Sequence, residues 1–209
     1  MPHVNVEIKA RCADLTRARA TLLALGARLV GPDYQLDTYF QVPNGRLKLR
    51  EGQIENNLIF YTRPDQDGPK RSDVILYGTR PGTDLKALLT AALGTLVAVE
   101  KRREIYFVEV SDVDVPGDPS APTRARGQEN VKVHLDTVTG LGSFVEIEAI
   151  DLDGSLGPAL LEAQCRRLMA RLNVQDADLE PASYSDLPRE QTSREQTSGE
   201  QTSDKRPGH

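Results

Sequence analysis

The stretch VNVEIKA, residues 4–10, alternates apolar and polar side chains without a break. Successive side chains of a β-strand lie on opposite faces, so one face of this strand is aliphatic and the other carries Asn5, Glu7 and Lys9. The aliphatic face needs a core to pack on, whereas the charged side chains need water or partners. The fold therefore depends on which side of the strand the core lies.

Similar strands follow along the chain. Strict alternation recurs at residues 46–50, 131–136 and 144–149, and less regular strands are predicted at 35–42, 58–63, 73–80 and 96–110. The turn sequences PNG at residues 43–45 and GLG at 140–142 are typical of hairpins, which join antiparallel neighbours.

Three amphipathic helices are also predicted. The first begins after a cap at Asp14 and ends at Gly26, the second begins at Asp84 and ends at Gly94, and the third covers about residues 156–172. Each carries one apolar stripe, which can pack on the aliphatic face of a sheet. Together the pattern predicts an α+β fold: an eight-stranded antiparallel β-barrel, or tunnel, with the amphipathic helices packed outside.

Composition sets the limits of this domain. We predict one domain over residues 1–188, interrupted at 111–129 by an inserted flexible loop rich in proline and glycine. Residues 189–209 repeat the unit EQTS three times and offer no apolar side chain that could pack. We therefore predict a disordered tail there.

The whole composition excludes several classes of protein. A hydrophobic fraction of 38% with 27% charged residues is typical of a soluble globular protein, and a net charge of −5 argues against nucleic-acid or membrane-surface partners. There is no apolar run of about 18 residues, no signal-peptide core and no close pair of cysteines, so we expect a cytoplasmic protein. The expected partner is a small molecule, and a homodimer is left open.

The polar faces of the strands are almost purely ionic and sorted by sign. A half-buried sheet with its polar faces in water accounts for any single strand, but it requires no such sorting. If the helices coat the outside of the barrel, these faces line its lumen, with eight bases against four acids. The bases are Lys9, Arg46, Lys48, Arg50, Arg63, Lys101, Arg103 and Lys132, and the acids are Glu7, Asp136, Glu146 and Glu148.

An excess of buried positive charge requires a wet cavity or a bound polyanion, because each unpaired buried charge costs on the order of several kcal/mol. A triphosphate meets that requirement: arginine forks and lysine ammonium groups hold phosphate oxygens, and Mg²⁺ takes one or two carboxylates besides the phosphates. The predicted metal ligands are Glu7, Glu146 and Glu148, with Asp136 nearby. The predicted catalytic residues are Glu7, Lys9, Arg103 and Glu146. The sequence contains neither a GxxxxGK[ST] loop nor a strand–GxGxxG–helix unit.

These residues also resemble a known family. The run NVEIK at residues 5–9 is similar to the ExExK signature of the CYTH domain, the triphosphate tunnel metalloenzymes that include class IV adenylate cyclases and thiamine triphosphatases. The resemblance continues through residues 48–50, 100–106, 134–148 and 180–187, so it covers about residues 3–187 in order. The last three stretches are most similar to the class IV cyclase branch.

The resemblance implies an eight-stranded tunnel that holds a triphosphate with Mg²⁺ or Mn²⁺. By position it makes Glu7, Glu146 and Glu148 metal ligands. It makes Lys9, Lys48, Arg50, Arg63, Lys101 and Arg103 phosphate contacts, whereas Arg46 and Lys132 are predicted from alternation alone. Asn5 stands where the signature has its first glutamate, so a lower metal affinity is expected. His134 is expected to be a hydrogen-bonded wall residue, with a proton shuttle as the alternative.

Three functions remain open at this point. The first is a class IV adenylate-cyclase-like lyase that makes cyclic AMP and pyrophosphate from ATP. The second is a hydrolase of thiamine triphosphate or tripolyphosphate, which uses water in place of the ribose hydroxyl. The third is a non-catalytic binder of nucleotide or polyphosphate.

Overall fold

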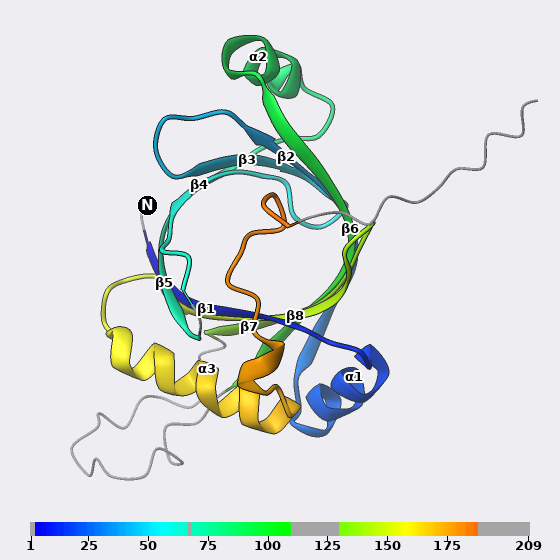
Figure 1. Ribbon diagram of the computed structural model, residues 1–209, viewed down its shortest axis with the longest axis vertical. Helices are drawn as coiled ribbons and strands as arrows, with labels where there is room; N and C mark the ends of the chain where they lie inside the picture. The colour runs from blue at the N-terminus through cyan, green and yellow to red at the C-terminus, as the bar shows by residue number, and fades with distance from the viewer. Residues whose placement is uncertain (1–2, 67, 110–129, 188–209) are drawn as a thin grey trace, which may run out of the picture.

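The computed structural model describes residues 3–66, 68–109 and 130–187; the predicted insertion at 111–129 and the predicted tail at 189–209 lie outside these ranges. Eight strands form a closed barrel in which every neighbouring pair is antiparallel (Figure 1), so the predicted architecture is confirmed. The strands are β1 (His3–Arg11), β2 (Arg28–Phe40), β3 (Arg46–Glu51), β4 (Asn57–Thr62), β5 (Lys70–Gly78), β6 (Thr95–Val108), β7 (Val131–Val138) and β8 (Gly142–Asp151). Their order around the barrel is β1-β5-β4-β3-β2-β6-β7-β8.

Two helices cover one side of the barrel. Helices α1 (Leu15–Ala24) and α3 (Pro158–Leu172) pack under β1, β7 and β8, with a short 3₁₀ helix, η2 (Asp176–Asp178), after α3 (Figure 1). The Asp14 carboxylate accepts the backbone N–H of Arg17 at 2.9 Å, which caps α1 as predicted. The main core lies between these helices and the outward aliphatic faces of the strands, with Ile8, Ile147 and Leu161 almost fully buried. This core turns the polar faces of the same strands into the lumen.

Helix α2 (Leu85–Leu93) covers less of the barrel than its apolar stripe predicts. It lies at the opposite side of the molecule from α1 and α3, beside β2 (Figure 1). None of its described residues is buried, and Leu88 is 61% exposed. Packing on the barrel therefore depends on α1 and α3.

Strand β2 begins at Arg28, seven residues before the predicted start at residue 35. It pairs with β6 over its whole length, with a register shift between Leu29 and Gly31. Gly31 has φ +150° and is followed by Pro32. A Gly-Pro pair is typical of loops, so the first half of this strand was not predicted from the sequence. The extension matters because it places Asp33 on the lumen side of β2.

The C-terminal residues 180–187, which we call the strap, run across one end of the barrel (Figure 1). Lys9 Nζ donates to the carbonyl oxygen of Ala182 at 2.6 Å, and Lys70 Nζ donates to that of Pro181 at 2.7 Å. These contacts lie where β1 ends and β5 begins, and we call this the strapped end. We call the opposite end, where β1 begins and β5 ends, the open end, because the strap does not cross it. No helix in the described part of the chain is both long and apolar enough to cross a membrane.

Candidate active site in the barrel lumen

The barrel lumen contains a charged cavity of about 140 Å³, which is partly open to solvent. The polar face of β1 lines it, as alternation predicted, with Asn5, Glu7 and Lys9. Ten of the sequence-predicted site residues are brought together there. They are Glu7, Lys9, Lys48, Arg50, Arg63, Lys101, Arg103, Lys132, Glu146 and Glu148.

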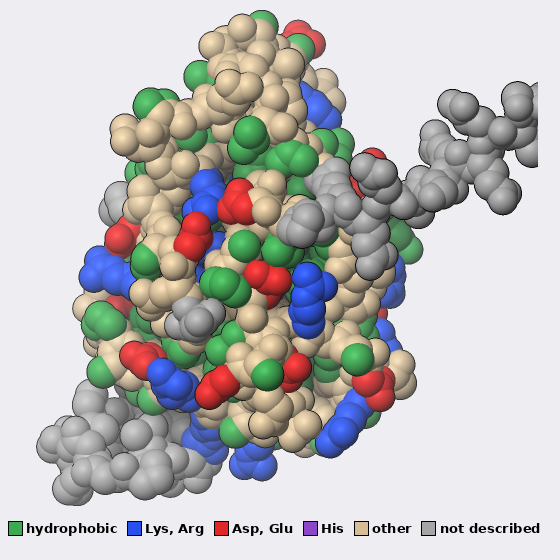
Figure 2. All heavy atoms as spheres, in the orientation of Figure 1, with side chains coloured by type: hydrophobic (Ala, Val, Ile, Leu, Met, Phe, Trp, Pro, Cys, Tyr) green, Lys and Arg blue, Asp and Glu red, His purple; other side chains and the backbone are tan. Residues whose placement is uncertain are grey.

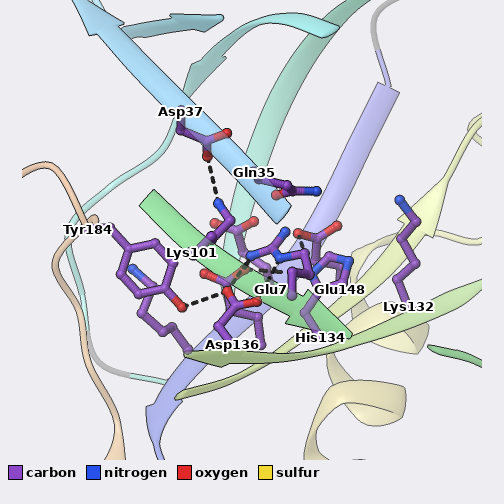
Figure 3. Close-up of polar contacts among 12 residues, drawn as sticks. Glu7, Gln35, Asp37, Lys101, Lys132, His134, Asp136, Glu148 and Tyr184 are labelled. Atoms are coloured by element: carbon purple, nitrogen blue, oxygen red, sulfur yellow. Dashed lines mark hydrogen bonds and ion pairs between the residues drawn. The ribbon is translucent and has the colours of Figure 1, made fainter. Parts of the chain in front are cut away.

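A buried carboxylate that sequence reasoning missed lies behind three of the bases. Asp37, on β2, is fully buried and accepts Arg50 Nε and Nη2 at 2.8 and 2.9 Å. It also accepts Lys101 Nζ at 2.7 Å (Figure 3) and Lys48 Nζ at 3.1 Å. Burial alone would raise the pKa of Asp37, but the three cations hold it well below its usual range. Asp37 thus fixes three cationic side chains beside the lumen.

The pKa values of two lysines of the lumen are lowered toward neutral pH. Burial lowers the pKa of Lys101 to about 7, although Asp37 opposes the shift. Burial likewise lowers the pKa of Lys9 to about 8, against the opposing attraction of Glu146. An anion bound beside these ammonium groups would restore their protonated form.

Asp136 is paired with Arg103. It is not among the described residues whose ligand atoms lie close enough together to hold a metal ion. Its carboxylate receives two hydrogen bonds from Arg103, at 2.8 and 2.5 Å, and one from the hydroxyl of Tyr184 at 3.0 Å (Figure 3). Arg103 also reaches Glu146 at 2.5 Å. Burial would raise the pKa of Glu146, but Arg103 and His134 hold it well below its usual range. Asp136 therefore orients Arg103 toward the acidic side of the lumen.

Three carboxylates and one imidazole lie together in the lumen. We call these four residues, Glu7, Glu146, Glu148 and His134, the acidic group. His134 Nδ1 lies 3.6 Å from an oxygen of Glu146 and 3.6 Å from one of Glu148, and ligand atoms of the three residues fall within 4.8 Å of one another. Glu7 is opposite Glu148 in the β1–β8 register and pairs with Arg63.

His134 differs from the hydrogen-bonded wall residue that the sequence predicts. It is 1% exposed, and neither ring nitrogen has a hydrogen-bond partner among the described residues. A buried imidazole with unsatisfied nitrogens beside two carboxylates is a donor set suited to a divalent cation. The residues present therefore fit a metal.

Glu55 is a second carboxylate that the sequence analysis missed. The carboxylate of Asp33 accepts the backbone N–H groups of Gln53, Ile54 and Glu55 at 2.6, 2.9 and 3.0 Å, which holds the loop between β3 and β4. From this loop Glu55 accepts Lys132 at 2.6 Å and Arg50 at 2.8 Å. A loop residue has no strand alternation to indicate its direction, so the sequence carried little signal for it.

Arg46 is placed outside the cavity lining. It lies at the strapped end, where it donates to Asp186 at 2.7 Å and to Asp65 at 3.1 Å. Asp37 and Glu55 add two acids to the predicted count, so the positive excess around the lumen is smaller than the sequence predicts. On the face seen in Figure 2, acidic and basic side chains are interspersed with hydrophobic ones.

Triphosphate tunnel proteins are a class defined by a closed antiparallel barrel. Bases from several strands and an acidic group line its lumen. The chain belongs to the CYTH domain family, because the model of that family matches residues 3–184. No curated protein matches the chain.

Solved structures share the fold at low identity. The PH1012 protein of Pyrococcus horikoshii is 21% identical with a TM-score of 0.64, and the match covers 87% of this chain and 97% of that one. A conserved hypothetical protein of Pyrococcus furiosus is 21% identical with a TM-score of 0.64, covering 88% and 99%. A candidate adenylate cyclase of Vibrio parahaemolyticus is 19% identical with a TM-score of 0.59, covering 86% and 94%.

Proposed function

We propose that this protein is a divalent-metal-dependent enzyme that cleaves a triphosphate inside the barrel, and that the reaction converts ATP to cyclic AMP and pyrophosphate. The observation that carries the proposal is the convergence of bases and carboxylates from several strands on one lumen. Lys48, Arg50 and Lys101 gather around Asp37, whereas Arg63 and Arg103 pair with the acidic group. The cationic group is Lys9, Lys48, Arg50, Arg63, Lys101 and Arg103.

The cationic group supplies binding and charge neutralisation. Arg50 and Lys101 are held by Asp37, and Arg103 is held by Asp136, so their donors are oriented before a ligand arrives. Preorganised donors stabilise charge without reorganisation cost, which is the main contribution a protein makes to phosphate chemistry. The described residues around the lumen therefore suit a substrate with several negative oxygens.

The acidic group would hold the metal. Glu7, Glu146, Glu148 and His134 offer oxygen and nitrogen ligands on adjacent strands. A divalent cation there would draw charge from phosphate oxygens and lower the pKa of an attacking hydroxyl. The ligand set would accept Mg²⁺ or Mn²⁺.

The lyase is the first candidate because the stretches most similar to class IV cyclases meet at one point. Arg103, Asp136 and Tyr184 come one from each of those three stretches and form one hydrogen-bonded unit. In the lyase step the ribose 3′ oxygen bonds to the α-phosphorus as the bond to the β-phosphate oxygen breaks. The hydroxyl proton passes to a carboxylate of the acidic group, and pyrophosphate leaves with its charge held by the cationic group.

A single assay tests this proposal. Purified protein is incubated with Mg²⁺ or Mn²⁺ and, separately, with ATP, thiamine triphosphate and tripolyphosphate, and the products are separated by chromatography. Cyclic AMP with pyrophosphate is the expected result. Orthophosphate release would replace the lyase with a hydrolase, and binding without turnover of any substrate would make the protein a binder. A Glu146→Gln variant should lose metal-dependent turnover while keeping triphosphate binding.

A further inference from the structure

The lumen is not charged throughout. Toward the open end its lining turns aliphatic on one wall, and the side chains come from neighbouring strands. These side chains are Ile59 of β4, Val74 and Leu76 of β5, and Ile150 of β8. Ile59 and Val74 are 7% and 8% exposed, and Ile59 is opposite Leu76 in the β4–β5 register.

Strand β1 lies between β5 and β8 and completes this wall with a polar side chain. Asn5 is opposite Ser72 on one side and Ile150 on the other. It is 6% exposed, and its Oδ1 has no hydrogen-bond partner among the described residues. A buried acceptor without a partner has lost its hydrogen bonds to water without replacement, so this amide is suited to receive a donor from a ligand.

This wall adds nothing to the binding of phosphate. An inorganic polyphosphate would leave its aliphatic surface against water, whereas an organic group would cover that surface and gain the hydrophobic contribution. The layout also fits an elongated molecule. Lys9 of the cationic group contacts the strap at the strapped end, and the aliphatic wall lies toward the other end.

We propose that the open end of the tunnel is a subsite for the organic group of a triphosphate ester. The aliphatic wall covers one face of that group, and the Asn5 amide accepts a hydrogen bond from it. The subsite selects organic triphosphates over inorganic tripolyphosphate, and it assigns Asn5 to substrate recognition at the position where the family signature has a glutamate. The inference rests on the proposed binding of the phosphates by the cationic group.

Calorimetric titration of the full chain with ATP, thiamine triphosphate and tripolyphosphate, without divalent metal, tests the subsite. We expect the wild-type protein to bind at least one organic triphosphate about tenfold more tightly than tripolyphosphate. Leu76→Ala, Ile150→Ala and Asn5→Ala should each remove most of that advantage and leave the tripolyphosphate affinity within about twofold. Ile75→Ala is the matched control, because Ile75 is the neighbouring aliphatic residue of β5 and lies outside the cavity lining.

The outcomes separate this inference from the proposed function. Equal affinity of the wild-type protein for organic and inorganic triphosphates, or equal weakening of both in the three variants, would overturn the subsite and leave the cationic group intact. Absence of binding by all three ligands would overturn both proposals. Whichever of ATP and thiamine triphosphate shows the larger loss in the variants identifies the organic group.

Discussion

At the scale of the residue, we predict that metal selection at the proposed site depends on His134. Its Nδ1 lies 3.6 Å from two carboxylates and has no hydrogen-bond partner in the described residues. Transition-metal ions accept an imidazole nitrogen more readily than Mg²⁺, which prefers oxygen. His134→Phe should therefore weaken Mn²⁺ binding by about tenfold and Mg²⁺ binding less.

Electron paramagnetic resonance of free Mn²⁺ measures the Mn²⁺ affinity directly, and Mg²⁺ is followed by competition. His3→Phe is the control, because His3 lines the cavity without belonging to the acidic group. Equal Mn²⁺ affinity in the His134 variant and in the wild type would remove His134 from the ligand set.

We predict that Lys101 makes triphosphate binding dependent on pH. Its ammonium faces Asp37, Arg50, Lys48 and Arg103, and burial lowers its pKa to about 7. At pH 8 only about a tenth of the lysine is protonated, so a bound anion, which raises the pKa, must bring a proton with it. Affinity should therefore fall as pH rises through 7, and binding at pH 8 should take up a proton.

Titration of ATP in two pH 8 buffers with different enthalpies of protonation detects this uptake as a difference in heat. Lys101→Arg keeps the charge and removes the titration, so the difference should shrink in that variant. Heats that do not depend on the buffer in the wild-type protein would show that Lys101 is already protonated.

At the scale of the element, the loop between β3 and β4 depends on one glycine. A Cβ at Gly52 would lie 2.7 Å from an oxygen of Asp33 and 2.7 Å from the carbonyl oxygen of Glu55. Gly52→Ala should therefore displace the loop that carries Glu55 and lower the free energy of unfolding by about 1–3 kcal/mol. Urea denaturation measures this loss.

Gly78 offers a matched control at the end of β5, because a Cβ there would meet open space. Gly78→Ala should change the free energy of unfolding by less than about 0.5 kcal/mol. If the two alanine variants unfold alike, the close approach of Asp33 to Gly52 does not constrain the loop.

Strict alternation predicted the elements well where it was present and poorly where it was not. It indicated which face of β1, β3, β7 and β8 is polar, and the helices packed on the opposite face of β1, β7 and β8 turned the polar faces of these three strands inward. In β4 and β5 the lumen face mixes Ile59 and Val74 with polar side chains, so no ionic pattern marked it. Asp37 and Glu55 were missed because one lies in an irregular strand and the other in a loop.

At the scale of the whole molecule, the barrel and its strap are formed by residues before 188. We therefore predict that a chain ending at Leu187 keeps the same free energy of unfolding to within about 0.5 kcal/mol and the same triphosphate affinity. Urea denaturation and calorimetric titration of the shortened chain measure both. A loss in either would show that the EQTS repeats contribute to the domain.

The order of residues along the chain predicted the architecture but not the pairing of charges inside it. A count of bases and acids treats each charge as equal. In the structure, however, Asp136 is hydrogen-bonded to Arg103, and Arg46 is hydrogen-bonded to Asp186 at the strapped end. Such pairings depend on side-chain reach across the barrel, which strand alternation does not encode. The strap shows the same limit, because its stretch resembled the family without indicating that it crosses the lumen.

The strap restricts one end of the barrel, because the carbonyl oxygens of Ala182 and Pro181 accept hydrogen bonds from Lys9 and Lys70. If the triphosphate binds as proposed, we expect its phosphates to enter first through the open end and to leave last. For a lyase this sets the sequence of departure: the cyclic nucleotide, nearer the exit, leaves before pyrophosphate. Pyrophosphate would then compete with the next ATP for the cationic group.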